Sequence, residues 1–149
     1  MSQMNEQDAR NLLAQHREYK ARVETLYQQI NAVQSQIDEC TSALNTINEL
    51  KEINDELDTM VPIGAGSYLH AKLTKPDTVV VNIGAGISVE KTVENAIKTL
   101  NRRKDDLTKT VEQLQSSMNQ LTKSIEEIEN KFQDYSQSQQ RQPPQYSGQ

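Results

Sequence analysis

Two copies of the tripeptide Gly-Ala-Gly, at positions 64–66 and 84–86, are the part of this sequence that most invites a chemical interpretation. Glycine-rich loops can hold phosphate groups because their backbone N–H groups approach the anion closely. A dinucleotide-binding loop, however, needs a third glycine and a following helix, and a P-loop needs Gly-Lys-Ser/Thr. Neither pattern is present. Tight hairpin turns also need residues that tolerate positive φ, so we interpret both copies as turns.

The cysteine and the histidines offer little further chemistry. Cys40 is the single cysteine, which excludes an internal disulfide, and we interpret it as a small buried hydrophobe rather than a reactive thiol. His16 and His70 lie far apart in the sequence, so we expect no metal site and no cofactor, and His16 is interpreted as solvated or locally paired. No nucleophile, base and orienting residue can be placed together, so we do not expect an enzyme.

The composition argues against a round globule. Of the 149 residues only 34% are apolar and 25% are charged, which suits an elongated molecule whose apolar residues form a thin seam. The net charge of -5 disfavours non-specific binding to nucleic acid or to a membrane surface. We find no apolar run that could span a bilayer and no secretory signal at the start. We therefore expect a cytoplasmic location.

A long helix is predicted before the first glycine copy, because residues 5–58 contain neither Gly nor Pro. Asn5 with Asp8 three residues later resembles a capping box. Apolar side chains then recur at alternating steps of three and four, the period of a left-handed coiled coil. This first seam consists of Ala9, Leu12, His16, Tyr19, Val23, Leu26, Ile30, Val33, Ile37, Cys40, Leu44 and Ile47. After Ile47 the spacing slips, as expected where the helix enters another structure.

A second long helix is predicted after the second glycine copy, with Ser88 as its N-cap and Glu90 in its first turn. Its seam keeps the alternation of three and four throughout, and Lys104 is its one member that is not apolar. This second seam consists of Val93, Ile97, Leu100, Lys104, Leu107, Val111, Leu114, Met118, Leu121, Ile125, Ile128, Phe132 and Tyr135.

The two seams are almost equal in length, so the helices are expected to pair antiparallel. Matching their ends places Leu12 near Tyr135 and Cys40 near Leu107. The helix ends have no further turn to cover them, so some apolar side chains there should be partly exposed. These tip residues are Leu12, Leu13, Tyr19, Phe132 and Tyr135. The polar, proline-interrupted residues 137–149 are interpreted as a disordered tail.

Between the helices the period changes and predicts four strands, at 61–63, 67–73, 78–83 and 87–89. Residues correspond at an offset of 20, for example Ile63 with Ile83, so the simplest arrangement is two similar hairpins in tandem. Two hairpins are marginal alone, and their apolar edges and faces need partners. We therefore predict that the module assembles with other subunits, and closing a barrel with them would satisfy both its edges and its faces. The assembly residues are Val61, Ile63, Gly64, Gly66, Tyr68, Leu69, Val79, Val81, Ile83, Gly84 and Gly86.

Two motifs together resemble the alpha class of the prefoldin family. They are M-V-P-I-G-A-G-S-Y-L-H-A-K-L at 60–73 and V-V-V-N-I-G-A-G-I-S-V-E-K-T at 79–92, each beside a long helix. The resemblance implies a mainly α fold: a long antiparallel two-helix coiled coil joined by two tandem β-hairpins that form a β-barrel platform with other subunits. The domains are then a first helix at 1–59, the assembly module at 60–89, a second helix at 90–136 and the tail at 137–149.

The resemblance also implies a function. Two alpha and four beta subunits would form a hexamer that holds non-native proteins at its coiled-coil tips without ATP and passes them to a group II chaperonin. The tips map to residues near 1–19 and 130–137. The alternative is a non-catalytic coiled-coil scaffold or tether that binds specific partners, although it would not need a duplicated hairpin module.

Overall fold

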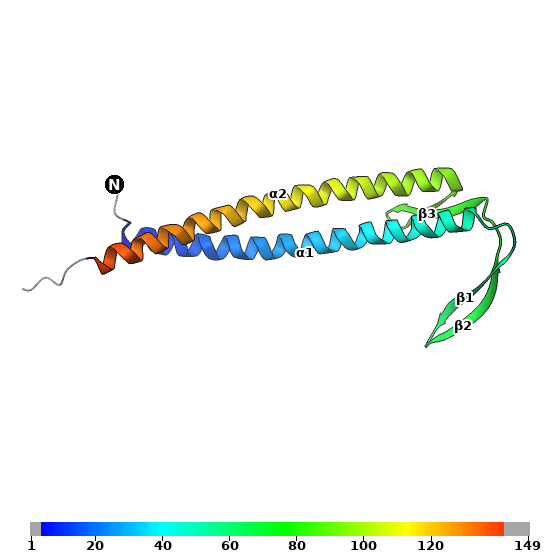
Figure 1. Ribbon diagram of the computed structural model, residues 1–149, viewed down its shortest axis with the longest axis horizontal. Coiled ribbons are helices and arrows are strands. Elements are labelled where there is room, and N and C mark those ends of the chain that lie inside the picture. The colour runs from blue at the N-terminus through cyan, green and yellow to red at the C-terminus, as the bar shows by residue number, and fades with distance from the viewer. Residues whose placement is uncertain (1–3, 142–149) are drawn as a thin grey trace, which may run out of the picture. The chain divides into compact units, whose positions relative to one another are not determined.

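The computed structural model describes residues 4–141. The chain runs α1 (Glu6–Lys51), β1 (Leu57–Gly64), β2 (Ser67–Leu73), β3 (Thr78–Gly84), β4 (Ile87–Thr92) and α2 (Val93–Gln140), as Figure 1 shows. The mainly α fold with two hairpins between two long helices is the predicted one. Two compact units can be distinguished: residues 33–109, and the first and last parts of the chain, up to residue 32 and from residue 110.

The capping box at the start of α1 is confirmed. The Asn5 side-chain oxygen accepts a hydrogen bond from the Asp8 backbone N–H at 2.8 Å. In return, the Asp8 carboxylate accepts one from the Asn5 backbone N–H at 3.2 Å. Two backbone donors that a helix start leaves without partners are thereby satisfied, and the helix begins at Glu6.

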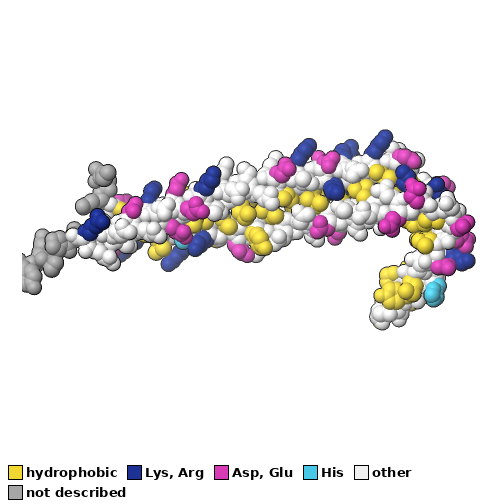
Figure 2. Space-filling model, in the orientation of Figure 1, with side chains coloured by type: hydrophobic (Ala, Val, Ile, Leu, Met, Phe, Trp, Pro, Cys, Tyr) yellow, Lys and Arg dark blue, Asp and Glu magenta, His cyan; other side chains and the backbone are white. Residues whose placement is uncertain are grey.

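Burial follows both predicted seams along the whole of α1 and α2. Every residue of the two seams is buried or half-buried, while the positions between them are mostly exposed. Figure 2 shows the same pattern as hydrophobic side chains that gather between the helices, with charged side chains outside. Burying one such side chain contributes about 1.5–3 kcal/mol, so the 3.5-residue spacing accounts for the helix pairing.

In the unit of residues 33–109, the helix pair and β3 share one core. Its buried members come from the end of α1, the start of α2 and the middle of β3. They are Leu44, Ile47, Val81, Val93, Ala96 and Leu100, with Ala43, Val79 and Ile97 packed against them. The second hairpin is therefore held against the helices of its own chain.

The two hairpins repeat the same geometry. In each, the strands pair antiparallel and a bulge precedes the turn, between Pro62 and Gly64 in the first and between Asn82 and Gly84 in the second. Ala65 and Ala85 have φ of 49° and 50°, and the glycines that follow them have φ of 71° and 73°. Positive φ at both central residues is what a two-residue turn of this hand requires. The Gly-Ala-Gly copies are thus turns, as predicted.

Several predicted boundaries differ from the structure. The first helix was expected to reach residue 59 but ends at Lys51, and β1 already begins at Leu57. The reason is the long pairing of β1 with β2, which includes Leu57 opposite Leu73. No Gly or Pro marks this change of structure in the sequence, so the helix end could not be read from composition.

The second helix also begins later than predicted, at Val93 rather than near 90. Residues 88–92 belong to β4 and pair with β3, so Ser88 is not the N-cap. The side-chain oxygen of Thr92 accepts the Asn95 N–H at 3.3 Å and caps the helix instead. At the other end α2 continues to Gln140, so the predicted tail is wrong for residues 137–140. Residues 142–149 of that tail lie outside the described residues.

Candidate assembly and client-binding surfaces

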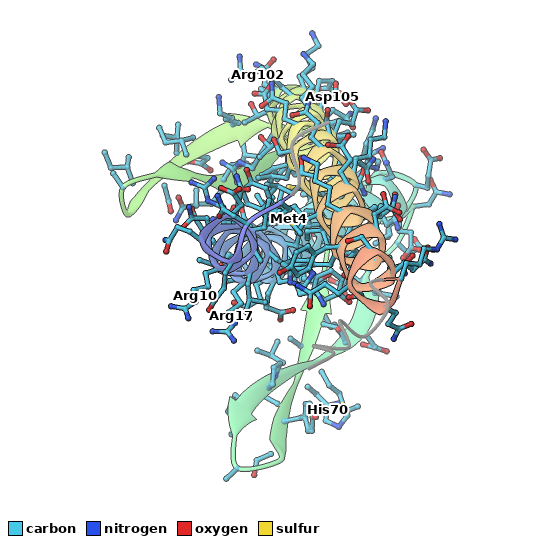
Figure 3. The ribbon with its side chains drawn as sticks, turned by 90° about the vertical axis from the view of Figure 1, so that its left-hand side faces the viewer. Met4, Arg10, Arg17, His70, Arg102 and Asp105 are labelled. Atoms are coloured by element: carbon cyan, nitrogen blue, oxygen red, sulfur yellow. The ribbon has the colours of Figure 1, made fainter. Side chains whose placement is uncertain are left out.

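The β1–β2 hairpin carries apolar side chains on both faces. Pairing in register places Val61 beside Leu69 and Leu57 beside Leu73 on one face, while Met60 and Tyr68 lie on the other. All six are exposed, from 39% for Leu73 to 59% for Met60. Figure 2 shows this hairpin as a concentrated hydrophobic patch, with a histidine beside it, and Figure 3 labels that residue as His70. Such a patch on a two-stranded sheet is the mark of an interaction surface.

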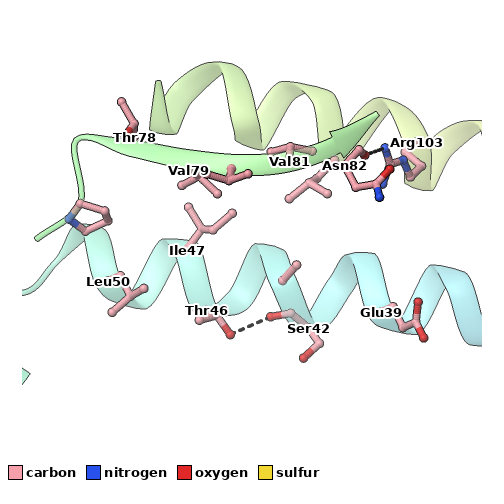
Figure 4. A pocket seen from close by; sticks show the side chains of 14 residues that line it. Glu39, Ser42, Thr46, Ile47, Leu50, Thr78, Val79, Val81, Asn82 and Arg103 are labelled. Carbon is pink, nitrogen blue, oxygen red and sulfur yellow. Dashed lines mark hydrogen bonds between the residues drawn. The ribbon is translucent and has the colours of Figure 1, made fainter. Parts of the chain in front are cut away.

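The β3–β4 hairpin differs because one of its faces is partly covered. Val79 and Val81 point toward Ile47 of α1 (Figure 4), and only 5% of Val81 is exposed. Val89 of β4, which pairs with Val81, is nevertheless 36% exposed, and Ile83, at the bulge before the turn, is 50% exposed. The hairpin thus buries part of this face against the helices of its own chain, and the rest of the face is exposed.

A polar contact joins this hairpin to α2 as well. The guanidinium of Arg103 donates a hydrogen bond to the backbone carbonyl oxygen of Asn82 (Figure 4). The side-chain oxygen of Asn82 in turn accepts the Gly84 N–H at 2.8 Å, next to the bulge. Asn82 therefore links the turn of the hairpin to the helix.

A groove of about 640 Å³ runs between β3 and α1. Its wall on the strand side consists of five consecutive residues, 78–82, and includes no residue of β4. Side chains of both faces line it, so the groove follows the edge of β3 that has no strand beside it. The other wall is one face of α1, from Glu39 to Leu50, together with Leu100 and Arg103 of α2. An unpaired strand edge beside an apolar groove can accept a further strand.

The structure places most predicted assembly residues on exposed strand surface. Val61, Ile63, Tyr68, Leu69 and Ile83 are 44–58% exposed. Gly64 and Gly84 end their strands, and Gly66 and Gly86 lie in the turns that follow. Val81 is instead buried in its own chain and Val79 is half-buried. The predicted set of assembly residues omits further apolar residues of the hairpins that are exposed in the structure. They are Leu57, Met60, Leu73, Val80, Ile87 and Val89.

The predicted tip residues lie in the other unit, near the start of α1 and the end of α2. Leu12, Tyr19, Phe132 and Tyr135 are half-buried, and Leu13 is 43% exposed. A shallow pocket of about 330 Å³ is lined by Phe132 and by Gln and Ser side chains of the last turns of α2. The helix ends therefore present some apolar surface among polar groups.

One polar cluster crosses from helix to helix at this end. His16 Nε2 donates a hydrogen bond to Glu129 Oε1 at 2.9 Å, and Lys20 Nζ lies 3.9 Å from the same oxygen. The His16 side chain is only 17% exposed because it occupies a seam position. The hydrogen bond from His16 holds the pKa of Glu129 below its ordinary value of 4.5, with a smaller contribution from the charge of Lys20.

Outside these surfaces we find little that could do chemistry. Cys40 is a free thiol buried in the seam. Within residues 4–141, no three His, Cys, Asp or Glu side chains gather as a metal ion would require. None of the helices in this range is both long enough and apolar enough to cross a membrane.

Two long helices that pair through an apolar seam, joined by two tandem hairpins, define a coiled-coil protein with a β module. A family model described as Prefoldin subunit matches residues 19–138. The prefoldin subunit alpha of Methanococcoides burtonii is 49% identical over 118 residues, which is 79% of this chain and 86% of that protein. The prefoldin subunit alpha of Methanosarcina mazei is 48% identical over 121 residues, 79% of this chain and 84% of that protein.

A solved structure is similar as well. It is a cryo-EM structure of filamentous PFD from Methanocaldococcus jannaschii, matched with a TM-score of 0.67 and 28% identity over 77% of this chain and 95% of that one. The chain therefore belongs to the prefoldin subunit family. Membership implies a chaperone role, since prefoldins are chaperones and not enzymes.

Proposed function

We propose that this chain is the alpha-type subunit of an ATP-independent holdase, which captures non-native proteins at its helix ends and passes them to a group II chaperonin in the cytoplasm. The observation that carries the proposal is the exposed apolar surface of the hairpins. All large exposed hydrophobic residues of the described chain lie in strands β1–β4, except Leu13 and Tyr27. A chain with this much uncovered strand surface needs partner subunits.

The partners proposed are beta-type prefoldin subunits, in a hexamer of two alpha and four beta chains. Three features support strand pairing between subunits: the two apolar faces of β1–β2, the unpaired edge of β3 and the groove of about 640 Å³ beside it. Added strands would satisfy the edge hydrogen bonds and cover the exposed side chains together, as a closed barrel does. Glycines with positive φ allow tight turns in both hairpins, so the turns do not hinder such pairing.

Client binding is proposed for Leu12, Leu13, Tyr19, Phe132 and Tyr135. Their partial exposure suits weak and adaptable contacts, because each leaves part of an apolar side chain available to an apolar segment of a client. Several helix pairs in one assembly would then hold one client by multivalency. Because the mechanism needs no nucleotide, release follows from competition or from folding of the client.

The test is suppression of aggregation of several unrelated unfolded proteins by the complex of this chain with a beta-type partner. Leu12→Ala with Phe132→Ala should weaken suppression severalfold while the mass of the complex stays the same. The matched control is Tyr27→Ala, which removes a 54% exposed aromatic side chain outside the tips. If only one defined protein binds and unrelated clients still aggregate, the chain is a specific scaffold or tether and the holdase proposal fails.

A further inference from the structure

The polar cluster of His16, Glu129 and Lys20 lies near the free ends of the two helices. His16 follows Leu12 and Leu13 by one turn, and Glu129 precedes Phe132 by one turn. On the terminal side of the cluster every seam residue is only half-buried. Directly on the inner side, Ile128 is 5% exposed. Further inward the seam residues from Tyr19 to Val33 and from Ile125 back to Leu114 are half-buried too, so the cluster is a polar cross-link within a partly buried seam.

Several side-chain hydrogen bonds near the helix ends lie within a single helix. Gln139 Nε2 donates to the Tyr135 hydroxyl at 2.7 Å, and Gln15 Nε2 donates to the Tyr19 hydroxyl at 2.9 Å. The Ser138 hydroxyl donates to the Tyr135 carbonyl oxygen at 2.7 Å. Each of these bonds stays within one helix. They stabilise the single helices but do not hold one helix to the other.

The cluster, by contrast, joins the two helices. A polar residue at a seam position costs stability relative to an apolar one and is used to specify alignment. His16 is such a residue, and its hydrogen bond to Glu129 is made only when the two helices are in this register. Terminal turns open at little cost, because their backbone groups lack helical partners and few side chains are buried there. An interhelical bond about three turns from the helix ends sets how far that opening spreads.

We propose that His16 and Glu129, assisted by Lys20, form a clasp that confines opening of the helix ends to residues 6–15 and 130–140. Leu12, Phe132 and Tyr135 can then turn toward a client while the seam from Tyr19 inward stays closed. The role in client presentation rests on the proposed holdase function, but the clasp itself does not. His16 and Glu129 are positioning residues, and Lys20 adds little because it is 60% exposed at 3.9 Å.

Hydrogen exchange of backbone amides in the assembled complex, without client, tests the clasp. Glu129→Ala should speed exchange in residues 17–26 and 122–128 by about five- to tenfold, the change expected for loss of one partly exposed hydrogen bond. Glu127→Ala, which removes an exposed carboxylate two positions away, should leave exchange unchanged. His16→Leu makes the seam continuously apolar and should slow exchange in residues 6–15 as well.

Two results would overturn the clasp: exchange in Glu129→Ala equal to that in Glu127→Ala, or faster exchange confined to residues 6–15 and 130–140. Glu129→Gln keeps the shape and an acceptor for His16, so it should fall between the wild type and Glu129→Ala even if the alanine variant assembles poorly. Aggregation assays on the same variants separate the two proposals. If the wild-type complex fails to hold clients, the holdase function is lost, and the exchange data still decide the clasp.

Discussion

The backbone carbonyl oxygen of Asn82 accepts a hydrogen bond from Arg103, and this contact ties the turn of the second hairpin to the third turn of α2. Together with the burial of Val81, it fixes β3–β4 on the helices of its own chain. The first hairpin has no such anchor among the contacts of the described residues. The two halves of a repeated module thus differ: one is held against the helices of its own chain, and the other has exposed apolar side chains on both faces.

Arg103→Ala is expected to loosen the second hairpin. Loss of a hydrogen bond from a charged donor should cost about 1.5–3 kcal/mol of local stability, seen as faster amide exchange in β3 and β4. The matched control is Arg102→Ala, because Arg102 is the exposed neighbour that points away from the helix pair (Figure 3). Equal exchange in the two variants would mean that Arg103 does not hold the hairpin.

Val81 and Val80 are adjacent in the same strand, but a charge should lower the stability of the chain at Val81 and not at Val80. Val81 is 5% exposed, so Val81→Asp buries an unpaired carboxylate and should destabilise the chain by about 3–5 kcal/mol. Val80 is 68% exposed, and Val80→Asp should leave the helices intact. Thermal unfolding followed by circular dichroism at 222 nm, a standard helix signal, distinguishes them. Similar melting temperatures for the two variants would contradict the position of β3 on the helices.

The turn alanines offer a stabilising change. Ala65 has φ of 49°, in the left-handed region that costs energy for alanine and less for asparagine. Ala65→Asn also creates the Asn-Gly pair that this turn favours, and should raise stability by about 0.5–1 kcal/mol. Ala32→Asn provides the control, because the same substitution on the exposed face of α1 should lower stability slightly. Both are measured by thermal unfolding, and a loss of stability in Ala65→Asn would argue against this turn geometry.

Acidification should loosen the helix ends through Glu129. Its pKa is lowered in the folded chain, first by the hydrogen bond from His16 and then by Lys20. The carboxylate therefore stabilises the helix pair fully above the unfolded value of 4.5, and this contribution is lost as pH falls through the lower folded pKa. Amide exchange in residues 17–26, corrected for its intrinsic pH dependence, should rise below pH 4.5 in the wild type.

Glu129→Gln has no carboxylate to titrate at this position. Its corrected exchange should change less over the same acid range than that of the wild type. A loss of protection of equal size in both proteins would assign the acid response to other carboxylates.

The seams and turns could be predicted because each follows from a local rule. A spacing of three and four residues marks the buried stripe from Ala9 to Ile47, and positive φ explains both Gly-Ala-Gly copies. The helix ends could not be predicted well, since Lys51 to Leu57 contains no breaking residue and strand pairing of distant residues decides the boundary.

The sequence also could not predict which apolar strand residues are buried in their own chain and which are exposed. Val80 and Val81 have identical side chains, and only the packing of β3 on α1 shows that one is exposed and the other buried. Glu129 is one of several glutamates on α2, and its importance depends on the register that brings it to His16. The predicted register places residue 131 opposite His16, and the observed partner at 129 differs by two positions.

The mass of the assembled complex tests the central claim, that exposed hairpin surface joins this chain to its partners. Mixing the wild type with a beta-type prefoldin subunit should give, by native mass measurement, a complex of two copies of this chain with four partner chains. Leu69→Glu with Ile83→Glu changes one exposed residue in each hairpin and should leave the chain helical but unassembled, whereas Tyr27→Glu should assemble normally. A hexamer of unchanged mass in the double hairpin variant would contradict the account.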